Sequence, residues 1–328
     1  MLWGPSYAPG YARIIRWSSP CQALGISRAT PSKKHRRIMT SAAYRPGDRV
    51  NQDVVLLPFA RAHLEGALKL SQEMSWPYRF EDWDFALQLG HGFVLQRAGV
   101  VIGTAAWWPY GETHASAGMI IIAKAAQGRG YGARLMDALL ASAYPRTITL
   151  NSTAEGIMLY RRRGFVPIGV IHQHQGICEE RQKAPPSSLV RAMAASDFEA
   201  IMRLDREATG LDRQRMLDRL VQSADGYVLQ RDGIPSGYAI SRLFGRGHVI
   251  GPVVAESPTD ARTLIEAALA GLGRAFVRID TSASSQLGEW LEAVGLQQVG
   301  DATTMLLGTP PLSTGPARTF AIANQSFG

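Results

Sequence analysis

The sequence is poor in cysteine and contains no long apolar run. Only two of its 328 residues are cysteines, Cys21 and Cys178, and neither has a partner at a metal-binding spacing. We therefore expect no disulfide framework and no bound metal, and the sparse cysteine fits a reducing cytosol. No apolar stretch reaches the roughly 18 residues that a membrane-spanning helix requires. These absences predict a cytoplasmic protein with no membrane partner.

Acidic residues are missing from residues 1–47, whereas seven of the 35 Lys and Arg residues lie before Met39. Without those seven, 28 basic residues face 27 acidic ones, and the net charge falls from +8 to +1. The remainder is nearly neutral and offers no footprint for a nucleic acid. We expect a basic, disordered extension over residues 1–48. There are two alternatives: the segment is an Arg-rich targeting peptide, or it is upstream sequence ahead of a true start at Met39.

The most informative stretch joins an apolar run, a glycine loop and an amphipathic run. Met119 to Ala123 predicts a strand, Gln127 to Gly132 (QGRGYG) a loop, and Ala133 to Ala141 a helix. Glycines let the backbone approach a bulky anion, and the helix start adds free N–H groups and a positive dipole end. The spacing is Gln-x-x-Gly-x-Gly. It differs from Gly-x-Gly-x-x-Gly, and no Lys-Ser/Thr follows as in a nucleoside-triphosphate loop.

Hydrophobic periodicity around this loop predicts a strand, two helices, three antiparallel strands, a helix, a strand, a helix and a strand. A second motif, Leu-Tyr-x-x-x-Gly-Phe, runs from Leu159 to Phe165. The two motifs and the element order resemble the GNAT acyltransferases over about residues 51–176. The resemblance implies a layered α+β (α/β) fold, in which helices flank a mixed, mostly antiparallel sheet. It also implies acetyl-CoA as the acyl donor.

A second, altered copy of the pattern follows the first. The segment from Gly92 to Gly99 recurs at Gly226 to Gly233, an offset of 134, which predicts two tandem GNAT folds. The second copy has Glu256 to Asp260 (ESPTD) in place of the glycine loop, so we expect it not to bind CoA in the family's way. We expect it to pack on the first copy and to wall the acceptor pocket; a purely structural role is the alternative. The predicted boundaries are a catalytic domain at 49–178, a linker at 179–188, a degenerate domain at 189–308 and a flexible tail at 309–328.

The resemblance also implies which residues hold the acyl donor. The loop would bind the pyrophosphate, and the preceding strand edge would lie beside the pantetheine and polarise the thioester carbonyl. The expected cofactor-binding residues are Ile120, Ile121, Ile122, Gln127, Gly128, Arg129, Gly130, Tyr131, Gly132 and Asn151.

Amine attack on a thioester also requires a proton donor for the departing thiolate. Tyr160, at the family's acid position, is the candidate, because a phenol with a pKa of about 10 is protonated at neutral pH. Glu112 is a weaker candidate for a base, and ordered water could replace it. Aromatic residues gather where GNAT proteins cover the acceptor. Candidates for the acceptor pocket are Trp76, Trp83, Trp108 and His114.

The sequence thus predicts an N-acetyltransferase that moves an acetyl group from acetyl-CoA to a small-molecule amine by direct attack in a ternary complex. Three alternatives stay open: a longer acyl donor, a hydroxyl acceptor, or an acetyl-CoA-binding sensor or scaffold without turnover. Nucleic-acid binding through the basic extension is the remaining rival, and we expect no such partner. We expect a monomer or a homodimer.

Overall fold

The computed structural model describes residues 54–178 and 187–328. The expected extension at 1–48 and most of the expected linker at 179–188 lie outside the described residues. The described residues all fall within one compact unit. No helix in these two ranges is long and apolar enough to cross a membrane.

The first half follows the predicted order of elements. Its strands and helices are β1 (Val54–Pro58), α1 (Leu64–Glu73), α2 (Phe80–Leu89), β2 (His91–Arg97), β3 (Val100–Tyr110), β4 (His114–Ile122), α3 (Tyr131–Ala143), β5 (Thr147–Ser152), α4 (Ile157–Arg161) and β6 (Val166–Cys178).

The second half repeats this order and then adds one strand. Its elements are β7 (Val190–Ala192), α5 (Phe198–Thr209), α6 (Gln214–Val221), β8 (Asp225–Arg231), β9 (Ile234–Phe244), β10 (Gly247–Ala255), α7 (Pro258–Leu272), β11 (Ala275–Ser282), α8 (Gly288–Ala293), β12 (Gln297–Leu307) and β13 (Arg318–Ala321). Two tandem copies of one layered α+β fold, as predicted, are therefore present.

The helices form where apolar residues recur at helical spacing. In α1, Leu64, Ala67 and Leu70 are buried, and this three-residue spacing puts them on one face that packs on the sheet. At the start of α2, Asp82 in the third helical position accepts a hydrogen bond from the backbone N–H of the cap residue Arg79 at 2.9 Å.

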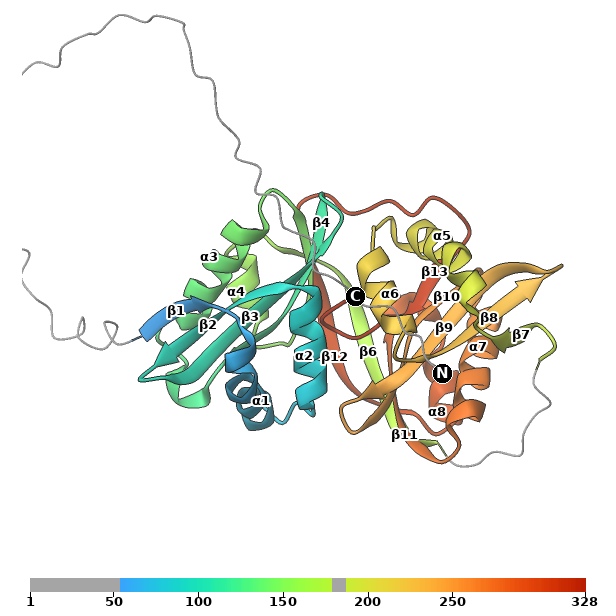
Figure 1. Ribbon diagram of the computed structural model, residues 1–328, viewed down its shortest axis with the longest axis horizontal. Coiled ribbons are helices and arrows are strands. Elements are labelled where there is room, and N and C mark those ends of the chain that lie inside the picture. Colours follow the sequence, from blue (N-terminus) through green and yellow to red (C-terminus); the bar gives the residue numbers. More distant parts are fainter. Residues whose placement is uncertain (1–53, 179–186) are drawn as a thin grey trace, which may run out of the picture. The chain divides into compact units, whose positions relative to one another are not determined.

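The described strands form one continuous 13-stranded sheet, and the two halves exchange strands where they meet. Strand β12 of the second half lies between β5 and β6 of the first, and β6 pairs in turn with β11. Figure 1 shows β6 and β12 side by side. The sequence predicted packing between the copies, but not this exchange.

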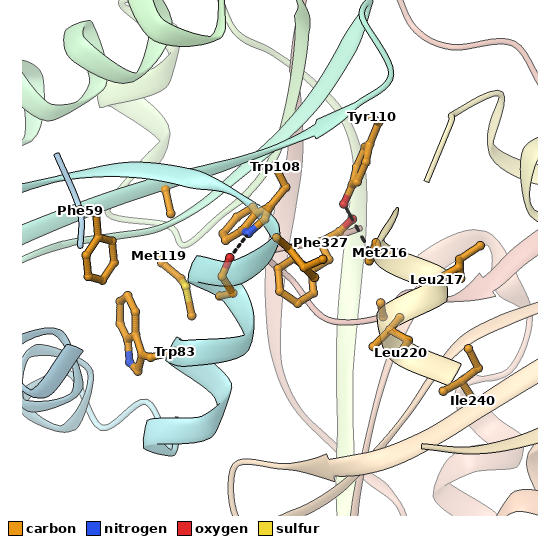
Figure 2. Packing of buried hydrophobic residues seen from close by; sticks show 14 of the residues in the cluster. Phe59, Trp83, Trp108, Tyr110, Met119, Met216, Leu217, Leu220, Ile240 and Phe327 are labelled. Carbon is orange, nitrogen blue, oxygen red and sulfur yellow. Dashed lines mark hydrogen bonds between the residues drawn. The ribbon is translucent and has the colours of Figure 1, made fainter. Parts of the chain in front are cut away.

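The two halves also share a hydrophobic core. One cluster joins Trp83 and Trp108 of the first half to Leu204, Met216 and Leu220 of the second. Figure 2 shows part of this cluster, with Met216 of α6 beside Tyr110 of the first half. The helix pairs α1–α2 and α5–α6 therefore cover sheet faces that meet in a common interior.

The expectation of a flexible tail at 309–328 is wrong for its second part. Residues Arg318–Ala321 form strand β13, which pairs with β10 and β11. Beyond it, Phe327 is only 2% exposed. Composition suggested a loose segment because Pro, Ser, Thr and Ala dominate it, but tertiary contacts override such local signals.

Candidate active site

The glycine loop forms an open cradle at the start of α3. Gly128 and Gly130 have positive φ values of 74° and 79°, a conformation that glycine adopts without strain. A Cβ atom on either residue would meet nothing within 4 Å, and residues 127–130 are exposed. The loop thus leaves free space above the first turn of the helix.

The N-terminus of α3 has no side-chain cap. Gly130 occupies the cap position, and no side chain accepts a hydrogen bond from the N–H groups of the first turn. Those groups and the helix dipole favour an anion at this end. Arg129 adds an exposed cation, while the hydroxyl of Tyr131 accepts a hydrogen bond from Arg97 at 3.2 Å. The geometry suits a phosphate group and fits the expected diphosphate of CoA.

Strand β4 leads into this loop with one free edge. Its pairing with β5 ends at Ala117 opposite Leu150, and a bulge follows at Met119, where φ is 52°. The Thr104 hydroxyl donates a hydrogen bond to the Met119 carbonyl at 2.7 Å, so the carbonyl at the bulge has a hydrogen-bond partner. The two strands diverge from there.

The direction of the free edge follows from the hydrogen bonds on the other side of β4. The N–H of Ala123 donates to the carbonyl of Ile102 on β3. Because successive residues alternate, Ile121 also faces β3, whereas Ile120 and Ile122 direct their N–H groups toward the gap beside β5. Gln127 donates to the Ile122 carbonyl at 3.1 Å. The edge therefore offers two backbone donors that no described strand pairs with.

Tyr160 lies on α4, buried among the side chains that α3 and α4 pack against the sheet. Its ring makes an edge contact with Phe165 at 5.9 Å. Burial raises the pKa of Tyr160 to about 12. The phenol is therefore protonated at neutral pH, as a general acid requires.

The candidate base Glu112 is not supported by its position. It is exposed in the turn between β3 and β4, seven residues before the bulge at Met119. At about 3.3 Å per strand residue, that separation amounts to roughly 23 Å. His114 stands at the same end of β4, with Nδ1 2.9 Å from the Thr113 hydroxyl. Neither residue reaches the strand edge beside the loop.

Two of the three tryptophans expected in the acceptor pocket belong to the core. Trp83 is fully buried and donates to Ser71 at 3.1 Å. Trp108 is 2% exposed and donates to the Ala86 carbonyl at 2.8 Å. Trp76 is partly buried and stacks at a tilt near Tyr78, with centroids 6.4 Å apart. Only Trp76 thus retains the part-exposed position that a pocket residue needs.

The side chain of Asn151 makes hydrogen bonds to other protein groups. Its Nδ2 donates to the carbonyl of Gln325 at 2.9 Å, and its Oδ1 accepts from Thr304 at 2.7 Å. Both partners come from the second half. This geometry argues against a direct contact between the Asn151 side chain and the acyl donor.

No sequence pattern pointed to residues 324–328, which lie against the first half. A Cβ on Gly118, the residue before the bulge, would lie 2.9 Å from the Ser326 hydroxyl. The Ser326 hydroxyl is also 3.3 Å from that of Tyr78. Tyr110 donates to the Phe327 carbonyl, and the rings of Trp108 and Phe327 meet edge-on at 4.9 Å, as Figure 2 shows. The C-terminal segment of the second half thus lies against β4 at Gly118.

The matching region of the second half is closed. Ser257 caps α7 by accepting from the Asp260 N–H at 3.2 Å, and Arg231 binds the Asp260 carboxylate at 2.5 Å. Strands β10 and β11 pair at His248 and Val249 and then diverge, but β13 fills the gap. The position that matches Tyr160 holds Leu291, which is fully buried. No anion cradle, strand gap or phenol is available there.

A concavity of about 780 Å³ lies elsewhere, on the surface of α5 and its neighbours. It is lined by Phe198, Glu199, Met202, Arg203, Arg206, Glu207, Gln214 and Thr314. None of the candidate residues lines it. Within the described ranges, no group of three or more His, Cys, Asp and Glu residues is placed to hold a metal ion.

Comparisons with known sequences agree with this division into halves. Two family models, each described as an acetyltransferase (GNAT) domain, match residues 88–167 and 201–321. The uncharacterised N-acetyltransferase YitH of Bacillus subtilis is 27% identical over 67% of this chain and 80% of its own length. A holothin acyltransferase of Pseudoalteromonas is 27% identical over 49% of this chain, and the match spans 55% of that relative.

Solved structures support the same fold. A protein from Pyrococcus horikoshii, described provisionally as an acetyltransferase, has a TM-score of 0.72 at 20% identity, over 90% of this chain and 100% of its own. A tandem GNAT protein from the clavulanic acid biosynthesis pathway has a TM-score of 0.56 at 15% identity, over 77% of this chain and 98% of its own. With both domain matches and this architecture, the chain is a tandem member of the GNAT family of acyltransferases.

Proposed function

We propose that this protein is an acetyl-CoA-dependent N-acetyltransferase that acts on a small-molecule amine, and that only the first half is catalytic. The observation that carries the proposal is the uncapped, glycine-lined start of α3 beside the unpaired edge of β4. A diphosphate fits the first feature, and an extended amide chain that ends in a thioester fits the second.

In the proposed reaction, the loop residues 127–132 hold the pyrophosphate through backbone N–H groups. The N–H groups of Ile120 and Ile122 orient the donor and polarise the thioester carbonyl. A neutral amine attacks that carbonyl, the carbon–sulfur bond breaks, and Tyr160 protonates the departing thiolate. The amine gives up its proton to water, since neither Glu112 nor His114 reaches the strand edge.

The nature of the acceptor is part of the proposal. One relative of this chain is named a holothin acyltransferase. The described residues around Gly118 of β4 come from the junction of the two halves, which share a hydrophobic core there. Such a junction suits a compact amine better than a protein tail.

Release of free thiol from acetyl-CoA with a panel of small amines tests the proposal, and calorimetry with CoA tests binding separately. Binding and amine-dependent thiol release together would support an N-acetyltransferase. Binding without release by any amine would favour a sensor or scaffold. Release only with longer acyl-CoA donors would change the donor, and the absence of binding would refute the proposal.

A further inference from the structure

Arg242 on β9 is a buried guanidinium without an acidic partner. The residue is 7% exposed, and its Nε and Nη2 atoms are buried with no hydrogen-bond partner among the described residues. Its Nη1 makes one long hydrogen bond, of 3.4 Å, to the Leu243 carbonyl. A buried charge without a partner is costly, and proteins rarely retain one without a reason.

The nearby carboxylates are already used by other arginines. Arg79 binds Asp82 at 2.8 Å, and Arg278 binds Asp280 at 2.8 Å. Together with Arg242, these groups amount to three guanidinium groups against two carboxylates. Burial lowers the pKa of Arg242 to about 10, so its guanidinium stays charged at neutral pH. The cluster has one positive charge in excess.

The shape of the free donor pair indicates which anion fits. The Nε and Nη2 atoms share one edge of the planar guanidinium and point in parallel. A carboxylate accepts two parallel hydrogen bonds from that edge, which is the strongest common pairing of these groups. The vacant hydrogen-bonding capacity of Arg242 therefore matches a carboxylate.

Arg242 lies close to the proposed acceptor side of β4. Its guanidinium stands over the ring of Phe85 at 5.5 Å, and that ring is 5.8 Å from Phe327. Ser326, the preceding residue, packs on Gly118 beside the β4 bulge. Three successive contacts thus connect the guanidinium to the strand whose edge is proposed to hold the thioester.

The internal repeat shows that this cation is specific to the second half. With the offset of 134, Arg242 corresponds to Trp108 of the first half, and both lie in the third strand of their copy. The second half has therefore placed a charge where the first has an apolar core residue. Both side chains face the shared interior, since Trp108 and Arg242 each contact its aromatic residues.

From these observations we infer that the amine acceptor carries a carboxylate group, which Arg242 binds at the junction of α2 and β9. The inference rests on the proposed function and narrows its substrate to amino acids and related amino carboxylates. It gives the second half a direct role, because that half supplies the anchor and the first half supplies the chemistry.

The first test compares pairs of acceptors that differ only in charge. Amino acids with aromatic and aliphatic side chains are assayed beside their carboxamides, with wild type and with Arg242→Met, Arg242→Lys and Arg246→Met. Arg246 is the matched control because it also stacks on a phenylalanine, Phe276 at 5.5 Å, but is exposed. The carboxylate-to-amide ratio of kcat/KM in each variant is divided by the wild-type ratio, which cancels differences in amine basicity.

We expect wild type to favour carboxylates by about 10-fold or more, since loss of one such pair is worth at least 1.4 kcal/mol. Arg242→Met should abolish the preference, Arg242→Lys should retain part of it, and Arg246→Met should leave it intact. The KM for acetyl-CoA should not change. A carboxylate-to-amide ratio in Arg242→Met equal to that of wild type would overturn the inference while acetyl transfer itself stands.

A binding test covers the case in which no amine is turned over. N-acetylphenylalanine and its carboxamide serve as probes, and the shift in Tm is measured for wild type and Arg242→Met. A larger shift with the carboxylate in wild type alone supports the inference, even where the transferase activity fails. Equal shifts with both probes would mean that ordered water alone satisfies Arg242, and would refute it.

The free protein provides an independent signature. Because an unpaired buried charge is destabilising, Arg242→Met should raise the Tm of the ligand-free protein by a few degrees. A fall in Tm of similar size, with the acceptor preference unchanged, would assign Arg242 a purely structural role and overturn the inference.

Discussion

The two halves of the chain use the same pair of diverging strands in opposite ways. In the first half, β4 and β5 separate after Ala117, and the edge of β4 stays unpaired by any described strand. In the second half, β10 and β11 separate after Val249, and β13 pairs with both of them. A gap that can receive an extended ligand in one copy is thus filled with the protein's own chain in the other.

The helix that follows each diverging strand shows the same contrast. The start of α3 has no side-chain cap and lies under exposed glycines, whereas α7 is capped by Ser257 and carries Asp260 bound to Arg231. A helix start that satisfies its own N–H groups has no need of an external anion. The comparison suggests that a duplicated fold loses a ligand site by replacing each ligand contact with an internal one.

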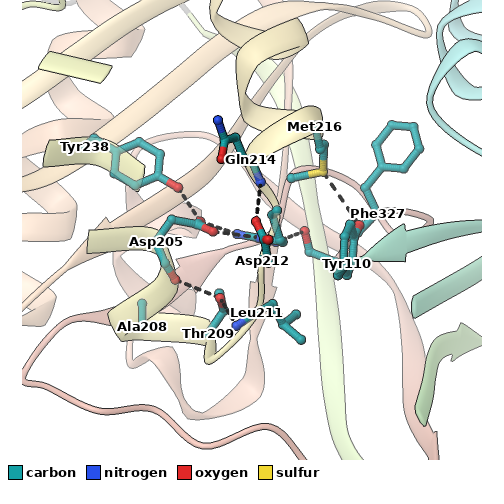
Figure 3. Close-up of polar contacts among 12 residues, drawn as sticks. Tyr110, Asp205, Ala208, Thr209, Leu211, Asp212, Gln214, Met216, Tyr238 and Phe327 are labelled. Carbon is teal, nitrogen blue, oxygen red and sulfur yellow. Dashed lines mark hydrogen bonds and ion pairs between the residues drawn. The ribbon is translucent and has the colours of Figure 1, made fainter. Parts of the chain in front are cut away.

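The largest effect is expected for a buried ion pair inside the second half. Asp205 pairs with the buried Arg213 at 2.5 Å and accepts from Tyr238 at 2.6 Å, and Arg213 also donates to the Gly328 carbonyl at 2.8 Å. Figure 3 shows the contact between Asp205 and Tyr238. Asp205→Ala would leave a buried cation unpaired and should cost about 3–5 kcal/mol of unfolding free energy.

Urea denaturation measures this cost, with Asp212→Ala as the control. Asp212 is half exposed and stands 3.6 Å from Arg206, so its loss should cost little. If Asp205→Ala does not fold, Asp205→Asn keeps the shape and should still be less stable than wild type. Equal stabilities for the Asp205 and Asp212 variants would show that the second half does not depend on this internal pair.

The next largest effect is expected when an acidic residue, as found in the matching segment of the second half, is introduced into the glycine loop of the first. Gly130→Asp places a carboxylate at the uncapped start of α3, and Asp tolerates the positive φ there better than most residues. The KM for acetyl-CoA should rise about 100-fold, equivalent to about 2.7 kcal/mol, because the carboxylate competes with phosphate. Steady-state kinetics measure it.

Gly233→Asp is the matched control for this change. Gly233 has a φ of 78° and equally free space at its Cβ position, but it lies in the turn between β8 and β9. Both variants should therefore have a similar backbone strain, because each places Asp at a positive φ. Only Gly130→Asp should weaken acetyl-CoA binding. An unchanged KM in Gly130→Asp would exclude the loop as the diphosphate site.

The sequence predicted the two folds, the glycine loop and the helix that carries Tyr160, because these depend on local patterns of glycine and apolar spacing. It could not predict that β6 and β12 are exchanged. Both strands belong to similar repeats, so either pairing satisfies the same hydrophobic pattern. Nor could the sequence predict that Arg242 and Phe327 both contact Phe85 of the first half. Those contacts join residues far apart in the chain, which no periodicity reveals.

Tyr160 offers a contrast of chemistry, because the second half has Leu291 at the matching position. Tyr160→Phe should lower kcat by about 10- to 100-fold while the KM for acetyl-CoA stays the same. Since burial raises the pKa of Tyr160 to about 12, loss of its proton should not reduce kcat below pH 10. A kcat profile from pH 7 to 10 measures both. Tyr227→Phe in the second half is the control, and equal turnover in the two variants would remove the role of Tyr160.

The smallest effect concerns the cap that closes the second half. Ser257→Ala removes the side chain that accepts from the Asp260 N–H, and loss of such a cap typically costs about 1 kcal/mol. Because β13 still fills the strand gap, the KM for acetyl-CoA should be unchanged. Thermal denaturation and kinetics on the same sample give both values. A changed KM would mean that the second half takes part in donor binding. In that case the segment that replaces its glycine loop would hold the same ligand in another way.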